Sequence, residues 1–265
     1  MTGIVQRYSG KNISIDLGKA DALLTEAEQV KGEVFRPTEH IKVYILEVKN
    51  TPKGPRITVS RTHPELVKRL FEAEVTEIQD GTVEIMSIAR EAGSRTKMAV
   101  RTNNPNVDAV GACVGKNGER VNAIVEELRG EKIDIVNWDE NPGNFIQNAL
   151  SPAKIVAVFA DPDEKTAKVV VPDYQLSLAI GKEGQNARLA ARLTGYKIDI
   201  KSETQAKDAE GFRYEDYMYD EDGDVYYEED EYENGGAAEA EETAEAVDTE
   251  AADETAEEVT EESNE

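Results

Sequence analysis

Two stretches of the sequence share one pattern, and together they decide the fold. Residues 114–120 read VGKNGER, and residues 180–186 read IGKEGQN. The first glycines of the two stretches lie 66 residues apart, and each is followed, 17 or 16 residues later, by the tetrapeptide KIDI. A single Gly-x-x-Gly would arise by chance in a chain of this length and glycine content. Two copies with the same surroundings indicate a duplicated structural unit.

Each loop is suited to hold a phosphate group. Glycine has no Cβ, so a turn built from glycines can lie close to a sugar–phosphate backbone. The helix expected after each loop presents unpaired N–H groups and a partial positive charge, and a lysine adds a full charge. The predicted contact residues in and beside the loops are Gly115, Lys116, Asn117, Gly118, Arg120, Gly181, Lys182, Glu183, Gly184, Arg188 and Arg192.

A simpler interpretation of these residues remains open. Gly-x-x-Gly also permits a tight helix–helix turn, with the lysine in solvent, and arginines spaced i, i+4 are often only a solvated helix face. A P-loop is excluded, because that motif needs glycine, four residues, and then Gly-Lys followed by Ser or Thr. Gly111 is too close to Gly115, and Asn117 occupies the Ser/Thr position.

Residues 1–63 carry the pattern of a small β-barrel. Short runs of alternating apolar and polar residues, such as 13–17, 41–45 and 56–60, are separated by turns that contain glycine. About five such strands favour a closed barrel, because closure removes the exposed edges of a short sheet.

Each loop is embedded in a mixed α/β segment. Before the first loop, strands are predicted near residues 82–90 and 95–102, and helices are predicted near 106–113 and 118–129. Residues 153–201 repeat this order in a shorter form. The predicted domains are therefore residues 65–140 and residues 141–203.

The negative charge of the chain is concentrated at its end. The net charge is −25, yet residues 1–205 hold 28 Lys and Arg against 29 Asp and Glu. Residues 206–265 hold two basic and 26 acidic residues. With few large apolar side chains, residues 204–265 are predicted to be a disordered acidic tail. The acidity of the whole chain therefore does not exclude nucleic-acid binding by the first 205 residues.

Several classes of protein are disfavoured by what the sequence contains. Cys113 is the only cysteine, and the only histidines are His40 and His63, so we expect no disulfide, metal site or cofactor. No run of about 18 apolar residues and no signal segment is present, so we expect a soluble cytoplasmic protein without membrane contact. No catalytic constellation stands out, and we expect a non-enzyme.

A Gly-x-x-Gly loop between two helices on a three-stranded sheet resembles the KH family, whose loop clamps about four nucleotides of single-stranded RNA. Because the strand pair precedes the helices, the order is similar to that of type II KH domains. With NPGNFI at residues 141–146 and ALSPA at 149–153, the pair resembles the tandem KH region of the NusA family. ISIDLG at 13–18 and ITVSRTH at 57–63 resemble its S1 domain.

This resemblance covers residues 1–201 and implies both a fold and a function. The implied fold class is α+β multidomain: an S1 or OB-type β-barrel, two type II KH domains and a disordered acidic tail. The implied function is that of a transcription elongation factor that binds nascent single-stranded RNA in pausing, termination and antitermination. The implied partners are RNA polymerase and other elongation and antitermination factors. The polymerase-binding domain with which that family normally begins has no counterpart here, so we expect a chain or fragment that lacks it.

The S1 resemblance also suggests contact residues on the barrel. In such barrels RNA lies across one face, where aromatic rings stack on bases and Arg or His meets phosphate. The candidates are Tyr8, Phe35, Arg36, His40 and Arg61. For Tyr8 and Phe35 a place in the barrel core is an equal alternative. Arg61 could simply be exposed to solvent.

Other basic residues and other functions have alternatives as well. Arg90, Arg95, Lys97 and Arg101 are interpreted as one face of a hairpin rather than as RNA contacts, and Trp138 as packing between the two KH domains. The alternative functions are a protein–protein scaffold and an accessory protein of RNA metabolism, both without polymerase contact.

Overall fold

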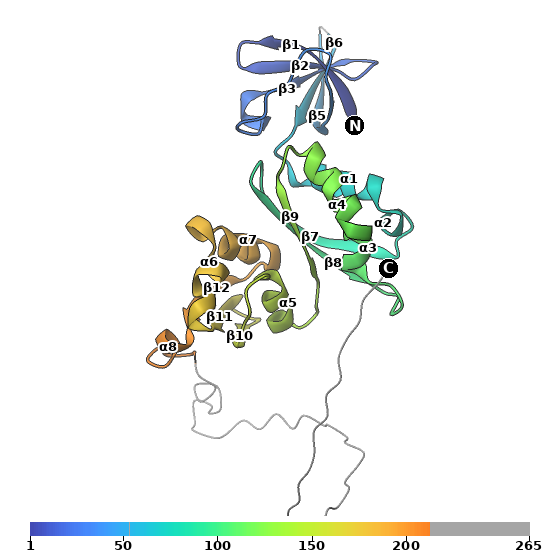
Figure 1. The fold of residues 1–265 in the computed structure, drawn as a ribbon. Helices are drawn as coiled ribbons and strands as arrows, with labels where there is room; N and C mark the ends of the chain where they lie inside the picture. The colour runs from blue at the N-terminus through green and yellow to red at the C-terminus, as the bar shows by residue number, and fades with distance from the viewer. Residues whose placement is uncertain (53, 213–265) are drawn as a thin grey trace, which may run out of the picture. The chain divides into compact units, whose positions relative to one another are not determined.

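The computed structural model describes residues 1–52 and 54–212 (Figure 1). The first part is a six-stranded sheet with the strand order β4-β1-β2-β3-β6-β5, in which β3 and β6 are parallel and the other neighbours antiparallel. Its strands are β1 (Thr2–Ser9), β2 (Asn12–Asp16), β3 (Asp21–Leu24), β4 (His40–Lys42), β5 (Tyr44–Thr51) and β6 (Gly54–Ser60), with a 3-10 turn η1 (Glu26–Glu28) after β3.

This sheet curls so that its two edge strands are halves of one bent strand. Strand β4 pairs with β1, strand β5 pairs with β6, and only Val43, which is fully buried, separates β4 from β5. Alternate residues of the strands, among them Val5, Ile13 and Ile15, point into one core. The resulting curled half-barrel is consistent with the expected S1 or OB-type fold.

The first α/β unit follows directly. His63 accepts a hydrogen bond from the Glu65 backbone N–H and Pro64 takes the first helical position, so a helix begins here. The sheet has the order β7-β8-β9, with β7 antiparallel and β9 parallel to β8. The elements are α1 (Pro64–Glu74), α2 (Thr76–Gln79), β7 (Val83–Glu91), β8 (Arg95–Thr102), α3 (Ala109–Val114), η2 (Lys116–Gly118), α4 (Glu119–Glu127) and β9 (Lys132–Asn137).

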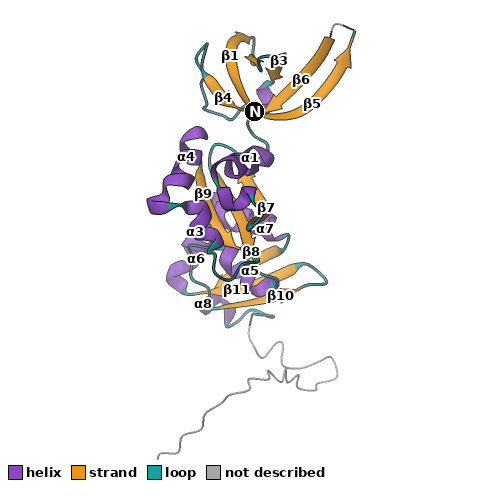
Figure 2. Ribbon diagram, turned by 90° about the vertical axis from the view of Figure 1, so that its right-hand side faces the viewer, coloured by secondary structure: helices purple, strands orange, loops and turns teal. Residues whose placement is uncertain are grey.

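The second unit repeats the order strand, strand, helix, loop, helix, strand. Its sheet is β10-β11-β12, again with the last strand parallel to the middle one. The elements are α5 (Pro142–Ala149), β10 (Ala157–Asp161), β11 (Thr166–Val171), η3 (Asp173–Gln175), α6 (Leu176–Ile180), η4 (Lys182–Gly184), α7 (Gln185–Thr194), β12 (Lys197–Ser202) and α8 (Glu203–Ala206). The duplication predicted from the two GKxG loops is thus a duplication of fold, with two KH domains (Figure 2).

The sheet of the first KH domain is covered on both faces. Met98 and Val100 on β8 point into a core that includes α1, α3 and α4. Ala99, between them, points the other way and belongs to a second core with Ile146 of α5 and Leu189 of α7. Because side chains alternate along a strand, β8 serves both cores at once. Trp138 packs against the second core, which confirms its predicted place between the KH domains.

Two parts of the second KH domain differ from the sequence-based expectation. Helix α5 is absent from the elements predicted from the sequence, although Asn141 caps it with two hydrogen bonds and Pro142 occupies its first turn. The predicted tail begins too early, because α8 and the following residues pack on the sheet, with Ala206 and Phe212 buried against Val170. The rest of the predicted acidic tail, residues 213–265, lies outside the described residues.

A buried ion pair joins the start of β9 to the strand pair. Arg90 donates to both carboxylate oxygens of Glu131 at 2.8 and 2.9 Å, with both side chains almost fully buried. Glu131 also accepts from Thr96 Oγ1 and from the Gly93 N–H. Burial alone would raise the pKa of Glu131, but the hydrogen bonds and charge of Arg90 and the two further donors lower it below its usual value.

We predict that Glu131→Gln destabilises the protein by about 3–5 kcal/mol, because Arg90 is left as a buried charge without its counter-ion. The measurement is urea unfolding followed by the fluorescence of Trp138, the only tryptophan. The matched control is Glu84→Gln, whose partner Arg101 is 34% exposed, and whose loss should cost at most about 1 kcal/mol. Equal effects of the two variants would contradict the assignment. Since the pKa of Glu131 is lowered on folding, the stability that this carboxylate contributes should be fully present above the pKa of an unfolded glutamate. It should be lost as the pH falls through the lower pKa of the folded state.

Candidate nucleic-acid interface

The two GKxG loops have the same backbone conformation. The first glycine has φ/ψ of 75°/174° in one copy and 76°/173° in the other. The third residue has 55°/24° and 53°/27°, and the last glycine 78°/13° and 75°/15°. Three of the four residues therefore have a positive φ, which non-glycine residues other than Asn and Asp rarely adopt. The repeated sequence motif therefore forms the same backbone turn in both domains.

The first glycine of each loop is required by close packing. A Cβ on Gly115 would lie 2.8 Å from Cγ of Arg120, and a Cβ on Gly181 would lie 2.8 Å from Cβ of Asn186. Real Cβ atoms do not approach this closely. In both copies the loop therefore folds back against the side chain five residues later, at the start of the next helix.

The tips of both loops are open to solvent. Lys116 and Asn117 are exposed in the first copy, and Lys182 and Glu183 are exposed in the second. The glycines beside them are partly exposed. The loops are thus accessible to a ligand, as the phosphate-binding interpretation requires. A carboxylate at residue 183 stands where the first loop has a neutral amide.

The arginines predicted beside the loops are held by carboxylates. Arg120 donates to Glu77 Oε2 at 2.8 Å and to the Ala112 carbonyl at 2.6 Å. The second bond satisfies a carbonyl near the end of α3. Arg188 donates to both oxygens of Glu91, at 2.5 and 3.2 Å, and Arg192 lies 3.8 Å from the same carboxylate.

Glu91 therefore connects the first KH domain to the second loop. It ends β7, whereas Arg188 lies on α7 and also donates to the Glu183 carbonyl within the loop. The bond from Arg188, with help from Gln185, lowers the pKa of Glu91 below its usual value. The carboxylate thus stays ionised well below neutral pH and neutralises much of the charge expected to meet phosphate.

The prediction for two of the barrel residues is wrong. The Arg61 side chain is 1% exposed, because Glu33 pairs with it through two hydrogen bonds, and it donates as well to the carbonyls of Lys42 and Glu127. Phe35 is 2% exposed and lies in the barrel core, with the Arg61 guanidinium 5.4 Å from its ring centre. Neither residue can lie under a strand of RNA.

The other three barrel candidates lie at the surface. Tyr8 is 46% exposed, and its hydroxyl donates to the Phe35 carbonyl at 3.0 Å, which fixes the ring position. Arg36 and His40 are exposed. They remain candidates for RNA contact.

The basic residues of the first KH strand pair act within the protein, as the hairpin interpretation predicts. Lys97 is fully buried, which lowers its pKa, and its Nζ donates to the Ser151 carbonyl at 2.8 Å. Arg101 pairs with Glu84 at 2.9 Å and lies over the ring of Trp138.

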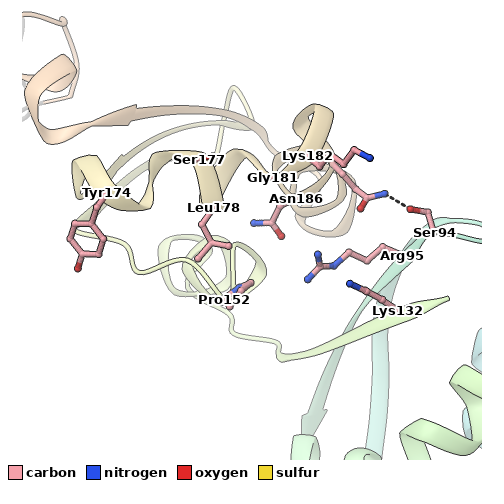
Figure 3. A pocket seen from close by; sticks show the side chains of 11 residues that line it. Ser94, Arg95, Lys132, Pro152, Tyr174, Ser177, Leu178, Gly181, Lys182 and Asn186 are labelled. Atoms are coloured by element: carbon pink, nitrogen blue, oxygen red, sulfur yellow. Dashed lines mark hydrogen bonds between the residues drawn. The ribbon is translucent and has the colours of Figure 1, made fainter. Parts of the chain in front are cut away.

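The structure also shows a site that the sequence analysis missed. A hollow of about 540 Å³ lies between the β7–β8 turn of the first KH domain and the second loop (Figure 3). Arg95, Lys132 and Lys182 line it, and Gln185 donates to Ser94 Oγ at 2.7 Å across it. Arg95 is paired with Asp134 at 2.7 Å. Lysine as the first residue of the KIDI tetrapeptide was the available signal for part of this site.

Other features of the described residues have no role in this site. Cys113 is buried, and burial raises the pKa of its thiol to about 12. Within residues 1–52 and 54–212, no cluster of His, Cys, Asp and Glu could hold a metal ion. No helix in that part of the chain is long and apolar enough to cross a membrane.

Comparison with known families matches both α/β units. Residues 61–138 match a family described as the NusA-like first KH domain, and residues 142–208 match the NusA-like second KH domain. The second match extends past the predicted boundary at residue 203, in agreement with the packing of α8.

Three proteins named transcription termination/antitermination protein NusA are similar to this chain. The protein from Bacillus subtilis is 63% identical over 208 residues, which are 78% of this chain and 56% of that protein. The protein from Mycobacterium bovis is 50% identical, over 77% of this chain and 61% of that protein. The protein from Thermus thermophilus is 47% identical, over 76% of this chain and 52% of that protein.

The chain spans little more than half the length of these relatives. The matched part contains two consecutive KH domains of the NusA type, preceded by a curled sheet consistent with an S1 or OB fold. Over this S1–KH–KH region, the chain belongs to the NusA family.

Proposed function

We propose that this chain is an RNA-binding transcription elongation factor that takes part in pausing, termination and antitermination. It binds nascent single-stranded RNA through the barrel and both KH domains, and acts in the cytoplasm with RNA polymerase and other elongation and antitermination factors. It is not an enzyme. The observation that carries the proposal is the pair of exposed GKxG loops with one backbone conformation.

The loops can bind phosphate without a base-specific contact. Each places an exposed lysine at the start of a helix, where the partial positive charge of the helix end adds to it. The last residue of each loop is a glycine, which has no Cβ. RNA can therefore approach the main chain closely at this position. Once one domain has bound the RNA, the linked domains meet the same strand at a high effective concentration. Weak contacts of the individual domains therefore combine into a higher affinity.

A protein–protein scaffold or an accessory protein of RNA metabolism, without polymerase contact, is the alternative. It is favoured by the finding that Arg61, Arg120 and Arg188 are paired with carboxylates. RNA binding with a steep salt dependence supports the first function, because it reports on contacts to phosphate. Capture of polymerase without RNA binding supports a scaffold.

We predict that Gly118→Asp combined with Gly184→Asp lowers RNA affinity at least about tenfold, because each loop then presents a negative charge to phosphate. The measurement is fluorescence anisotropy with a labelled single-stranded RNA. The matched control is the pair Gly118→Asn and Gly184→Asn, which places similar side chains at the same positive φ without charge. Equal losses in both pairs would show that shape, not charge, is responsible, and unchanged binding in the Asp pair would remove the KH mechanism.

Exchanging the third residue of the loops should move affinity in opposite directions. Glu183→Asn removes a carboxylate from the second loop and should strengthen RNA binding a few-fold, about the effect of one exposed charge. Asn117→Glu should weaken it by a similar factor. Both differences should shrink between 50 mM and 300 mM salt, because exposed charges are screened. Changes of the same sign in both variants would contradict an electrostatic role for this position.

We predict that removal of residues 213–265 strengthens RNA binding at low salt. These residues carry nearly all of the excess negative charge, which competes with RNA for Lys116 and Lys182. Truncation after Phe212 keeps the contacts of that ring with the second KH sheet. Equal affinity of the full and truncated chains at 50 mM salt would refute the competition.

A further inference from the structure

Arg61 lies at the junction of the barrel and the first KH domain. It follows the last residue of β6 and precedes α1, and its side chain is 1% exposed. On the barrel side it pairs with Glu33 through two hydrogen bonds and donates to the Lys42 carbonyl at 2.9 Å. Because the donors of a guanidinium form a rigid planar fork, these partners hold the group in one orientation.

The same guanidinium contacts the end of helix α4 in the KH domain. Its Nη2 donates to the Glu127 carbonyl at 3.0 Å, and its Nη1 donates to Glu127 Oε1 at 3.3 Å. The carbonyls in the last turn of a helix lack partners within the helix, and a positive charge there is favourable. Arg61 supplies both a donor and the charge to this helix end.

Further contacts join the same two parts of the chain. The backbone N–H of Lys42 in the barrel donates to Glu127 Oε1 at 3.1 Å, so this carboxylate binds two groups at the junction. Arg129 pairs with Glu39 of the barrel and lies 5.7 Å from the centre of the Phe35 ring. The barrel is therefore attached to the end of α4 by side chains from both domains.

Helix α4 connects this attachment to the first GKxG loop. It begins directly after Gly118, the last glycine of that loop, and it ends at Glu127. Its nine residues span about 13 Å. One short helix thus has the proposed phosphate-binding loop at its first end and the barrel at its other end. Fixing the second end sets the position of the barrel with respect to the loop.

A fixed position favours an RNA strand that contacts both surfaces. Only residues 61–63 join β6 to α1, so a barrel without these contacts would stay near the KH domain but could turn about the junction. Ordering such a joint on binding costs free energy. Contacts that already order it in the free protein remove this cost, and the second surface then meets the strand at a higher effective concentration.

We propose that Arg61 is a positioning residue for RNA binding. Together with Glu127, it holds the barrel on the end of α4 in the orientation in which the barrel and the first loop bind one RNA strand. Arg61 itself contacts no RNA and acts through the placement of the surfaces around it. The proposal rests on the proposed RNA binding by these domains, and it gives a role to a basic residue that is buried rather than exposed.

The test alters the KH side of the attachment. Replacing Arg61 itself would leave Glu33 as a buried charge without a counter-ion and endanger the barrel. Glu127 and Arg129 are 29% and 47% exposed, so Glu127→Ala combined with Arg129→Ala leaves no buried charge unpaired. This Ala pair removes one charge of each sign, so the net charge that attracts or repels RNA stays the same.

Two further variants serve as controls. Arg69→Ala combined with Glu72→Ala also removes one charge of each sign, from a pair within α1. Glu127→Gln is the conservative variant, because its Oε1 can still accept the hydrogen bonds from Arg61 and Lys42.

Affinity is measured by fluorescence anisotropy with the full chain and RNAs of two lengths. An RNA of about four nucleotides fills one KH loop, whereas one of about twenty can also span an OB-type barrel. The Ala pair should bind the short RNA like the unaltered chain and the long RNA about three- to tenfold more weakly. The α1 pair and Glu127→Gln should keep the ratio of the two affinities. A role in stability alone would not change this ratio.

Orientation is measured separately, as the distance between spin labels on Lys19→Cys in the barrel and Asn122→Cys on α4, both exposed positions. The native Cys113 is buried, so the label should not react with it. The distance distribution should be narrow in the unaltered chain and in Glu127→Gln, and broad in the Ala pair. Urea unfolding followed by Trp138 fluorescence checks that each variant is folded.

Two results would overturn the proposal. One is a distance distribution that stays narrow in the Ala pair, because any weaker binding of the long RNA would then report a direct contact of Arg129. The other is a broad distribution with an unchanged ratio of the two affinities, because orientation would then have no effect on binding. Failure of the proposed function is distinguishable, since the unaltered chain would then bind neither RNA.

Discussion

The structure depends on a close approach of the main chain to the residue five positions later, which only glycine permits. In each KH domain the first glycine of the loop lies against that side chain, and no Cβ could be accommodated there. The lysine that follows is exposed to solvent in both copies. The same constraint packs Asn186 directly behind the loop of the second domain. The absence of a Cβ at this position therefore determines how closely each loop packs on the following helix.

Several basic side chains in the described region are buried and bind groups of the protein itself. Arg61 donates to the Lys42 carbonyl in the barrel, and Arg90 pairs with Glu131 just before β9. Lys97 donates to the Ser151 carbonyl in the segment between the KH domains. Buried charges of this kind are costly unless they are fully paired, and each of these has a carboxylate or carbonyl partner. At the two loops, Lys116 and Lys182 are exposed to solvent.

The fold was predictable from the sequence because its signals are local. The glycine loops, the KIDI tetrapeptides and the alternating strands each need only neighbouring residues to be interpreted. Helix α5 could have been predicted too, since Asn141 and Pro142 are standard start signals. The burial of Arg61 could not, because its partners Glu33 and Glu127 lie 28 and 66 residues away. The hollow beside the second loop arises where two domains meet, and no pattern along the chain contains that information.

The sharing of strand β8 between two cores has a consequence during synthesis. A chain that has emerged from the ribosome only as far as Asn137 would expose Ala89, Ala99 and Val136 to water, because α5 and α7 are not yet made. This apolar face can be covered only by the residues translated next. The packing of the first KH domain is therefore completed only when the second domain has been made.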